Sequence, residues 1–100
     1  MDSFEIEMER DALRGAALAL KEASETLETS AAELETLARE SGTTLRLRRR
    51  CRRSARALRA LGAEFETRRL LLLLSDQERA VEQGRAYQFA RRLKDMGKKI

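Results

Sequence analysis

Histidine, proline, tryptophan and asparagine are absent from this chain of 100 residues, which has one cysteine and few aromatic side chains. Without histidine, acid–base catalysis would rest on Glu, Lys, Tyr or Cys. The sequence shows no carboxylate pair, no nucleophile beside a base and no glycine loop that could hold a phosphate. A lone cysteine allows no internal disulfide and, without histidine, no zinc site. We therefore expect no enzyme activity, no metal site and no cofactor.

Long apolar runs are also missing. No stretch reaches the roughly 20 apolar residues that span a bilayer, and the polar start Met1–Glu5 lacks the basic and apolar regions of a secretory signal. We expect a protein without a membrane span that stays in the cytoplasm or is exported without a cleavable signal peptide.

The residues that dominate the chain are Ala, Leu, Glu and Arg, which all favour the α-helix. We therefore expect an all-α protein with a single helical domain covering residues 1–100. A first helix is predicted over residues 3–41, with Asp2 and Glu5 as its N-terminal cap. Leucines recur in it at every seventh position, and mostly small residues follow four positions later. The two rows are Leu13, Leu20, Leu27 and Leu34, and Ala17, Ser24, Ala31 and Ala38. Such a heptad repeat predicts close packing against another helix.

Residues 41–44, with the sequence Ser-Gly-Thr-Thr, form the clearest break. Gly42 can adopt the left-handed conformation that ends a helix, and Thr43 or Thr44 can cap the next one. The short turn predicts an antiparallel, coiled-coil-like hairpin with a second helix over residues 44–96. At 100° per residue, one narrow arc of that helix faces the first: Leu47, Cys51, Ser54, Leu58, Leu61, Phe65 and Leu72. Cys51 is accordingly expected to be a small buried apolar residue.

Five consecutive leucines, Leu70 to Leu74, point around the whole circumference of a helix, so one neighbouring helix cannot cover them all. Either a third helix of this chain or a second protein must do so. The following Ser75-Asp76-Gln77-Glu78 matches a capping box, which leaves two alternatives. The second helix is continuous, or it breaks at 75–76 into a three-helix arrangement.

In the continuous alternative, the first helix is too short to cover residues 83–100. That segment keeps an amphipathic pattern and is expected to dock on a partner, whereas in the three-helix alternative it closes the bundle. The predicted partner-binding residues are therefore apolar side chains of the leucine run and of this segment. They are Leu70, Leu71, Leu73, Leu74, Tyr87, Phe89, Leu93 and Met96.

Charge divides the chain at the turn. Residues 1–41 hold eleven acidic and four basic residues, a net charge of −7, whereas residues 42–100 hold six acidic and seventeen basic residues, a net charge of +11. In a hairpin, the arginines of residues 46–59 are expected to lie beside Glu25, Glu28, Glu33 and Glu35. A polyanion could instead bind this run, and its candidate residues are Arg46, Arg49, Arg50 and Arg53. The acidic first helix and the lack of interleaved aromatics favour a solvated and partly paired face.

Two antiparallel helices joined near the middle of about 100 residues, with a tyrosine in the C-terminal segment, resemble the small Trp-x-Gly proteins of bacterial type VII secretion and their toxin-associated relatives. The resemblance lies in the layout. Ser41-Gly42-Thr43 stands where the family has Trp-x-Gly, and Tyr87 is followed four residues later by Arg91 rather than by an acid. The resemblance implies pairing with another helical hairpin and escort to an export system. Short coiled-coil chaperones of type III and flagellar export share the same sequence statistics.

The function we expect is that of a non-enzymatic interaction protein that pairs with another helical protein, in a hetero-complex or a homo-oligomer. Within a bacterial export system it would act as a secretion partner, targeting factor or chaperone. The alternative is a nucleic-acid-binding or regulatory protein that uses the arginine-rich second helix.

Overall fold

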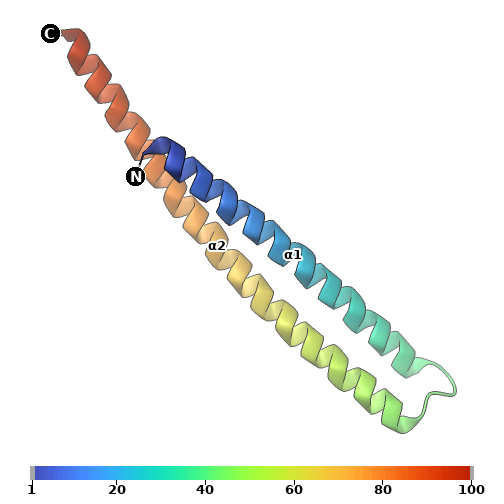
Figure 1. The fold of residues 1–100 in the computed structure, drawn as a ribbon. Helices are drawn as coiled ribbons and strands as arrows, with labels where there is room; N and C mark the ends of the chain where they lie inside the picture. The colour runs from blue at the N-terminus through green and yellow to red at the C-terminus, as the bar shows by residue number, and fades with distance from the viewer. Residues whose placement is uncertain (1, 100) are drawn as a thin grey trace. The chain divides into compact units, whose positions relative to one another are not determined.

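The computed structural model describes residues 2–99 and consists of two long α-helices joined by a short turn (Figure 1). Helix α1 runs from Ser3 to Arg39 and helix α2 from Leu45 to Lys99, and the described residues contain no strand. The predicted all-α helical hairpin is thus confirmed. Because α2 passes through Ser75 and Asp76 without a break, the structure shows the continuous-helix alternative.

The helix ends follow the local sequence. Asp2 Oδ1 accepts a hydrogen bond from the Glu5 backbone N–H at 2.8 Å and caps α1. Gly42 has a φ of +85°, a conformation that glycine adopts without steric strain. Thr44 Oγ1 accepts a hydrogen bond from the Leu47 N–H at 3.2 Å, so Thr44 rather than Thr43 caps α2.

The chain divides into two compact units. The turn unit comprises Leu18–Arg69, and the terminal unit comprises Met1–Ala17 with Leu70–Ile100. In the turn unit, the fully buried apolar side chains are all small: Ala31, Ala38, Cys51 and Ala55. The heptad leucines around them, Leu20, Leu27 and Leu34, are half-buried. Small residues in the contact let the two helices approach closely, and two helices alone cannot enclose the larger ones.

The contact line on α2 differs in part from the predicted arc. Cys51, Leu58 and Phe65 are buried or half-buried as predicted, whereas Leu47, Ser54 and Leu61 are exposed. Their places are taken by the residues one position later, Arg48, Ala55 and Gly62. The prediction was wrong there because it favoured larger residues, whereas the small Ala55 and Gly62 lie in the contact. Because Gly62 has no side chain, Ser24 can approach it closely. The Ser24 hydroxyl donates a hydrogen bond to the Gly62 carbonyl oxygen at 3.4 Å.

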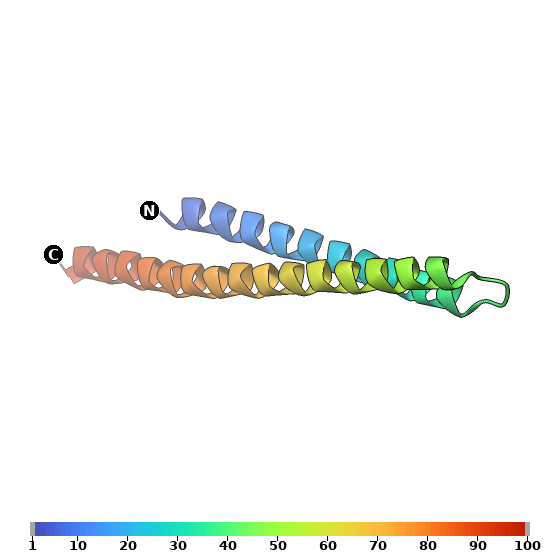
Figure 2. The ribbon, with the colours of Figure 1, turned by 90° about the horizontal axis from the view of Figure 1, so that it is seen from below.

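In the terminal unit, Ile6 is the one large side chain that is completely buried among the described residues, and Ala17 is the other buried apolar residue. Leu13 and Leu72 are half-buried. The last turns of α2 lie beyond the first turn of α1 in both views (Figures 1 and 2). From Tyr87 to Gly97, every side chain of α2 is exposed.

The protein exposes an unusual amount of surface for its size. Its accessible area is 7929 Å² at a mass of 11.4 kDa, about 2100 Å² more than the roughly 5800 Å² expected of a folded monomer of that mass. The excess is larger than the roughly 800 Å² that one partner buries in a standard protein interface. Neither helix, over the described residues, has a segment apolar enough to cross a membrane.

Candidate interaction surfaces

The leucine run, Leu70–Leu74, lies in the terminal unit and is only partly covered. Leu70, Leu71 and Leu74 are between 54% and 57% exposed, whereas Leu72 and Leu73 are half-buried. Leu72 continues the contact line of α2, seven residues after Phe65. Three leucines of the run therefore remain on faces of α2 that α1 does not cover.

The tail, residues 87–99, carries four further large apolar side chains that are exposed. Tyr87, Phe89, Leu93 and Met96 have exposed fractions between 53% and 66%. Leu93 follows the half-buried Ala86 by seven residues. It therefore keeps the heptad spacing of the contact line beyond the start of α1. The side of α2 that packs on α1 thus continues into the tail without a partner from this chain among the described residues.

Between these two surfaces, the contact of α2 with α1 is polar, and these polar contacts were not predicted from the sequence. Arg10 donates hydrogen bonds from Nε to Asp76 Oδ1 and from Nη1 to Gln83 Oε1, both at 2.9 Å. The hydrogen bond with Arg10 lowers the pKa of Asp76, and the same contact raises the pKa of Arg10. Counting in steps of four and three from Leu72 leads to positions 76, 79 and 83, so the heptad spacing could have predicted these contacts.

A second polar contact lies beside the first. Arg79 donates from Nε to Glu9 Oε1 at 2.8 Å and from Nη1 to Glu82 Oε2 at 2.6 Å. Hydrogen bonds to Glu82 and then Glu9 raise the pKa of Arg79. Polar residues at coiled-coil contact positions favour one register of the two helices over others.

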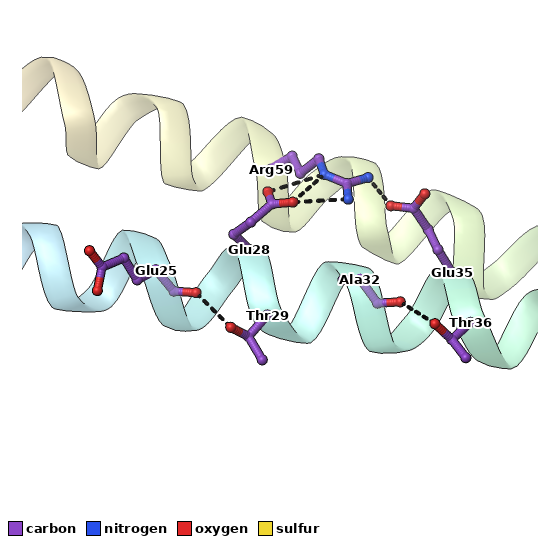
Figure 3. Close-up of polar contacts among 7 residues, drawn as sticks. All are labelled: Glu25, Glu28, Thr29, Ala32, Glu35, Thr36 and Arg59. Carbon is purple, nitrogen blue, oxygen red and sulfur yellow. Dashed lines mark hydrogen bonds and ion pairs between the residues drawn. The ribbon is translucent and has the colours of Figure 1, made fainter.

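The arginine run, residues 46–59, is only partly paired with the glutamates of α1. Arg59 donates to Glu28 from Nε at 3.2 Å and from Nη2 at 3.1 Å, and it also pairs with Glu35 (Figure 3). The pairing is therefore confirmed for Arg59. Among the described residues, the other arginines of the run, Glu25 and Glu33 form no ion pair.

Most arginines of the run line two open grooves of the turn unit. Leu45 and four arginines of α2 line the first, which holds all the predicted polyanion-binding residues: Arg46, Arg49, Arg50 and Arg53. The second lies between the helices and is lined by Glu35, Arg39, Arg52, Ala55, Arg56 and Arg59. Arg48 Nε is buried without a hydrogen-bond partner among the described residues. The hairpin itself leaves most of the positive charge of the run uncompensated.

Comparisons with protein-family models, with curated proteins and with solved structures find no match to this chain. Within residues 2–99, no three or more His, Cys, Asp and Glu side chains are grouped to hold a metal ion. Cys51 is a free thiol, buried in the helix contact. The surfaces that bear on function are therefore the leucine run, the tail and the arginine run.

Proposed function

We propose that this chain is a non-enzymatic interaction protein that pairs with another helical protein through the leucine run and the tail. The observation that carries the proposal is the exposure of large apolar side chains in one unit of a small protein. Leu70, Leu71, Leu74, Tyr87, Phe89, Leu93 and Met96 each expose more than half of their surface.

Burial of the leucine run by a partner would stabilise the complex. Full burial of a leucine stabilises by about 1.5–3 kcal/mol, so covering the exposed half of each of three leucines contributes roughly 1 kcal/mol apiece. A domain of this size is only marginally stable on its own core. A partner that covers the run would therefore add a substantial fraction of the total stability.

The spacing of the tail favours a helical partner. Leu72, Ala86 and Leu93 share one face of α2 at intervals that are multiples of seven. A second helix meets such a row with its own apolar face, as in helix-in-groove recognition. The polar contacts of Arg10 and Arg79 support this role because they hold α2 in one register between the leucine run and the tail.

The test is purification of the tagged full-length protein from its source organism, with and without nuclease. Wild type should retain a helical protein in fixed stoichiometry, and the double variant Leu70→Ser with Leu74→Ser should lose it. Leu18→Ser with Leu45→Ser is the matched control, since these two leucines are equally exposed but lie in the turn unit. Equal retention by both double variants would reject the leucine run as the binding surface.

Polyanion binding by the arginine run is a second candidate function, favoured by the arginines that α1 leaves without ion pairs. A duplex or single-stranded oligonucleotide should then bind with an affinity that falls steeply with salt. Replacing Arg49, Arg50 and Arg53 with Ala should reduce the slope of log K against log salt by up to about 0.9 per lost phosphate contact. Arg59→Ala is the control, since Glu28 and Glu35 already neutralise that residue.

A role in bacterial protein export is the finer proposal, and the layout resemblance supports it. In this role the helical partner would be an export substrate or a component of an export machine. Deleting the chain's gene should then leave that partner in the cell while other secreted proteins still reach the medium. Normal export of the co-purified partner in the deletion strain would reject the export role and leave the pairing function intact.

A further inference from the structure

The first turns of α1 carry an exposed apolar surface with acidic edges. Ile6 faces α2 and is fully buried, so Phe4 and Met8, two residues on either side of it, lie on the opposite side of α1. They are 69% and 58% exposed. Glu5 and Glu7 flank this pair on the two sides, and both are exposed.

The tail carries a matching surface of opposite charge. Phe89 and Leu93 are one helical turn apart, as Phe4 and Met8 are, and Arg92 and Lys94 flank Leu93. Residues 87–99 contain five basic residues and one acidic residue, whereas residues 2–11 contain five acidic residues and one basic residue. The two segments therefore have equal and opposite net charge.

We propose that the partner of the tail is a second copy of this chain. The tail of one copy packs on the outer face of α1 of the other, and the second tail packs reciprocally on the first copy. This inference rests on the proposed pairing function and identifies the occupant of the tail. The two copies form a closed, two-fold dimer, in which each tail and each α1 surface is used once.

The positions of the elements within the terminal unit make this arrangement geometrically consistent. α1 begins at Ser3, and Arg10, two turns into α1, contacts Asp76 and Gln83 of α2. The tail follows these contacts and continues the same face of α2. In the dimer, the partner's α1 covers that face of the tail, beyond the start of the first copy's α1. It then runs parallel to the tail, with the partner's Phe4 beside Phe89 and the partner's Met8 beside Leu93.

Charge excludes the simplest competing dimer. Two tails packed on one another would bring ten basic residues together with only two acidic ones, and two α1 outer faces would repel in the same way. Contact between a tail and an α1 start places Arg92 and Lys94 against the partner's Glu5 and the partner's Glu7. The arrangement therefore uses the one pairing of these surfaces that is favourable both in charge and in apolar contact.

The experiment is a charge exchange, followed by sedimentation of the full chain at low salt. Wild type should sediment as two chains of 11.4 kDa. The variant Arg92→Glu with Lys94→Glu and the variant Glu5→Lys with Glu7→Lys should each be monomeric, with dimer dissociation constants raised on the order of a hundredfold by like charges. Mixing the two variants should restore a dimer, because the two reversed surfaces then meet each other in one contact and the two unchanged surfaces meet in the other. Circular dichroism should show that each variant remains helical.

Arg49→Glu with Arg53→Glu is the matched control, since it makes the same charge change on exposed positions of α2 in the turn unit and should leave the dimer intact. A mixture that stays monomeric, or reversed variants that still dimerise, would overturn the inference. A monomeric wild type whose tail binds phosphatidylglycerol vesicles or a synthetic acidic helix would also overturn it. Binding of a synthetic acidic helix by a monomeric wild type would remain compatible with the proposed helical-partner function. That function is rejected separately if the leucine variants keep their partner.

Discussion

Arg10 Nε donates a hydrogen bond to Asp76 Oδ1 at 2.9 Å and so joins α1 to α2 across 66 residues of sequence. Both residues occupy positions in the helix contact where a coiled coil usually has an apolar side chain. A carboxylate and a guanidinium facing one another there tolerate only one relative position of the two helices. The pair therefore fixes which part of α2 lies beside the start of α1, and hence which part is left as the tail.

The lowered pKa of Asp76 predicts a specific loss of stability in acid. Its contribution is fully present above the ordinary value of 3.8 and is lost as the pH falls from there through the lowered folded-state pKa. Urea unfolding of wild type should show this loss, and Asp76→Asn should be less stable at neutral pH and lack that part of the acid dependence.

Glu78→Gln provides the control for this measurement, because Glu78 is an exposed carboxylate two residues away with no ion pair among the described residues. It should retain the wild-type acid dependence between neutral pH and the lowered pKa of Asp76. The same acid dependence in Asp76→Asn and in wild type would show that the hydrogen bond with Arg10 is not formed in solution.

The helices and the turn could be predicted because each depends on local sequence. Gly42 and Thr44 mark the reversal, and the leucines at every seventh position fix the face of α1. The contact line of α2 was predicted only in part, because the prediction looked for large apolar residues and the helices instead meet at Ala55 and Gly62. The contacts of Arg10 and Arg79 were missed for a related reason: a charged residue was assumed to lie outside the contact.

The candidate surfaces were predictable to a different degree. The excess of leucines over what one neighbour can cover follows from helix geometry, so the exposure of Leu70, Leu71 and Leu74 could be foreseen. The arginine run could not be assigned partners from sequence, because antiparallel alignment gives only the level of each residue along the hairpin. It does not give the side of α2 from which each arginine projects, and that side decides whether a glutamate of α1 is within reach.

Gly62 lies against α1. Replacing it can distinguish the effect of close helix packing on stability from the effect of helix propensity. A Cβ at this position would lie 3.7 Å from Ser24 Oγ and 3.9 Å from the Leu27 Cβ, both ordinary contacts. Gly62→Ala should therefore stabilise the protein by about 0.5–1 kcal/mol, since alanine favours the helix. Gly62→Leu should instead destabilise it by about 1–3 kcal/mol through overpacking. Denaturant unfolding measures both, and Gly84→Ala, which meets no neighbour, is the control for propensity alone. Stabilisation by Gly62→Leu would show that the helices do not meet closely at Gly62.

Gly42 has the positive φ that reverses the chain, and a side chain there should be costly. Gly42→Ala should reduce the free energy of unfolding by about 1–2 kcal/mol, because an L-residue is strained in the left-handed region. Gly15→Ala should have the opposite effect, as Gly15 lies inside α1 with open space around it. Equal effects of the two substitutions in thermal unfolding would contradict the observed conformation of the turn.

Cys51 is 4% exposed and should react with a thiol reagent only when the helices separate. The labelling rate of native protein should be slower than that of a denatured control by the factor that the local opening equilibrium sets. A variant with Cys51→Ala and Ser54→Cys moves the thiol to an exposed position of the same helix and should label at nearly the unfolded rate. Rapid labelling of wild-type Cys51 would place the thiol outside the helix contact.

Truncation after Ala86 tests whether the tail contributes to folding or to association. Every side chain described in the removed segment is exposed, whereas Gln83 and its hydrogen bond to Arg10 are retained. The free energy of unfolding, measured at a concentration where wild type is monomeric, should therefore change by less than about 0.5 kcal/mol. The dimer should disappear at every concentration where wild type forms it, because the apolar surface around Leu93 and the basic charge of the tail are both lost.

Truncation after Leu74 is the contrasting variant. It removes Asp76, Arg79 and Gln83 from the contact, exposes Ile6 and should destabilise the terminal unit strongly. If the protein ending at Ala86 unfolds as readily as the shorter one, the tail belongs to the folded core. If it still forms the wild-type dimer, the chains associate through another surface, and the leucine run is the next surface to test.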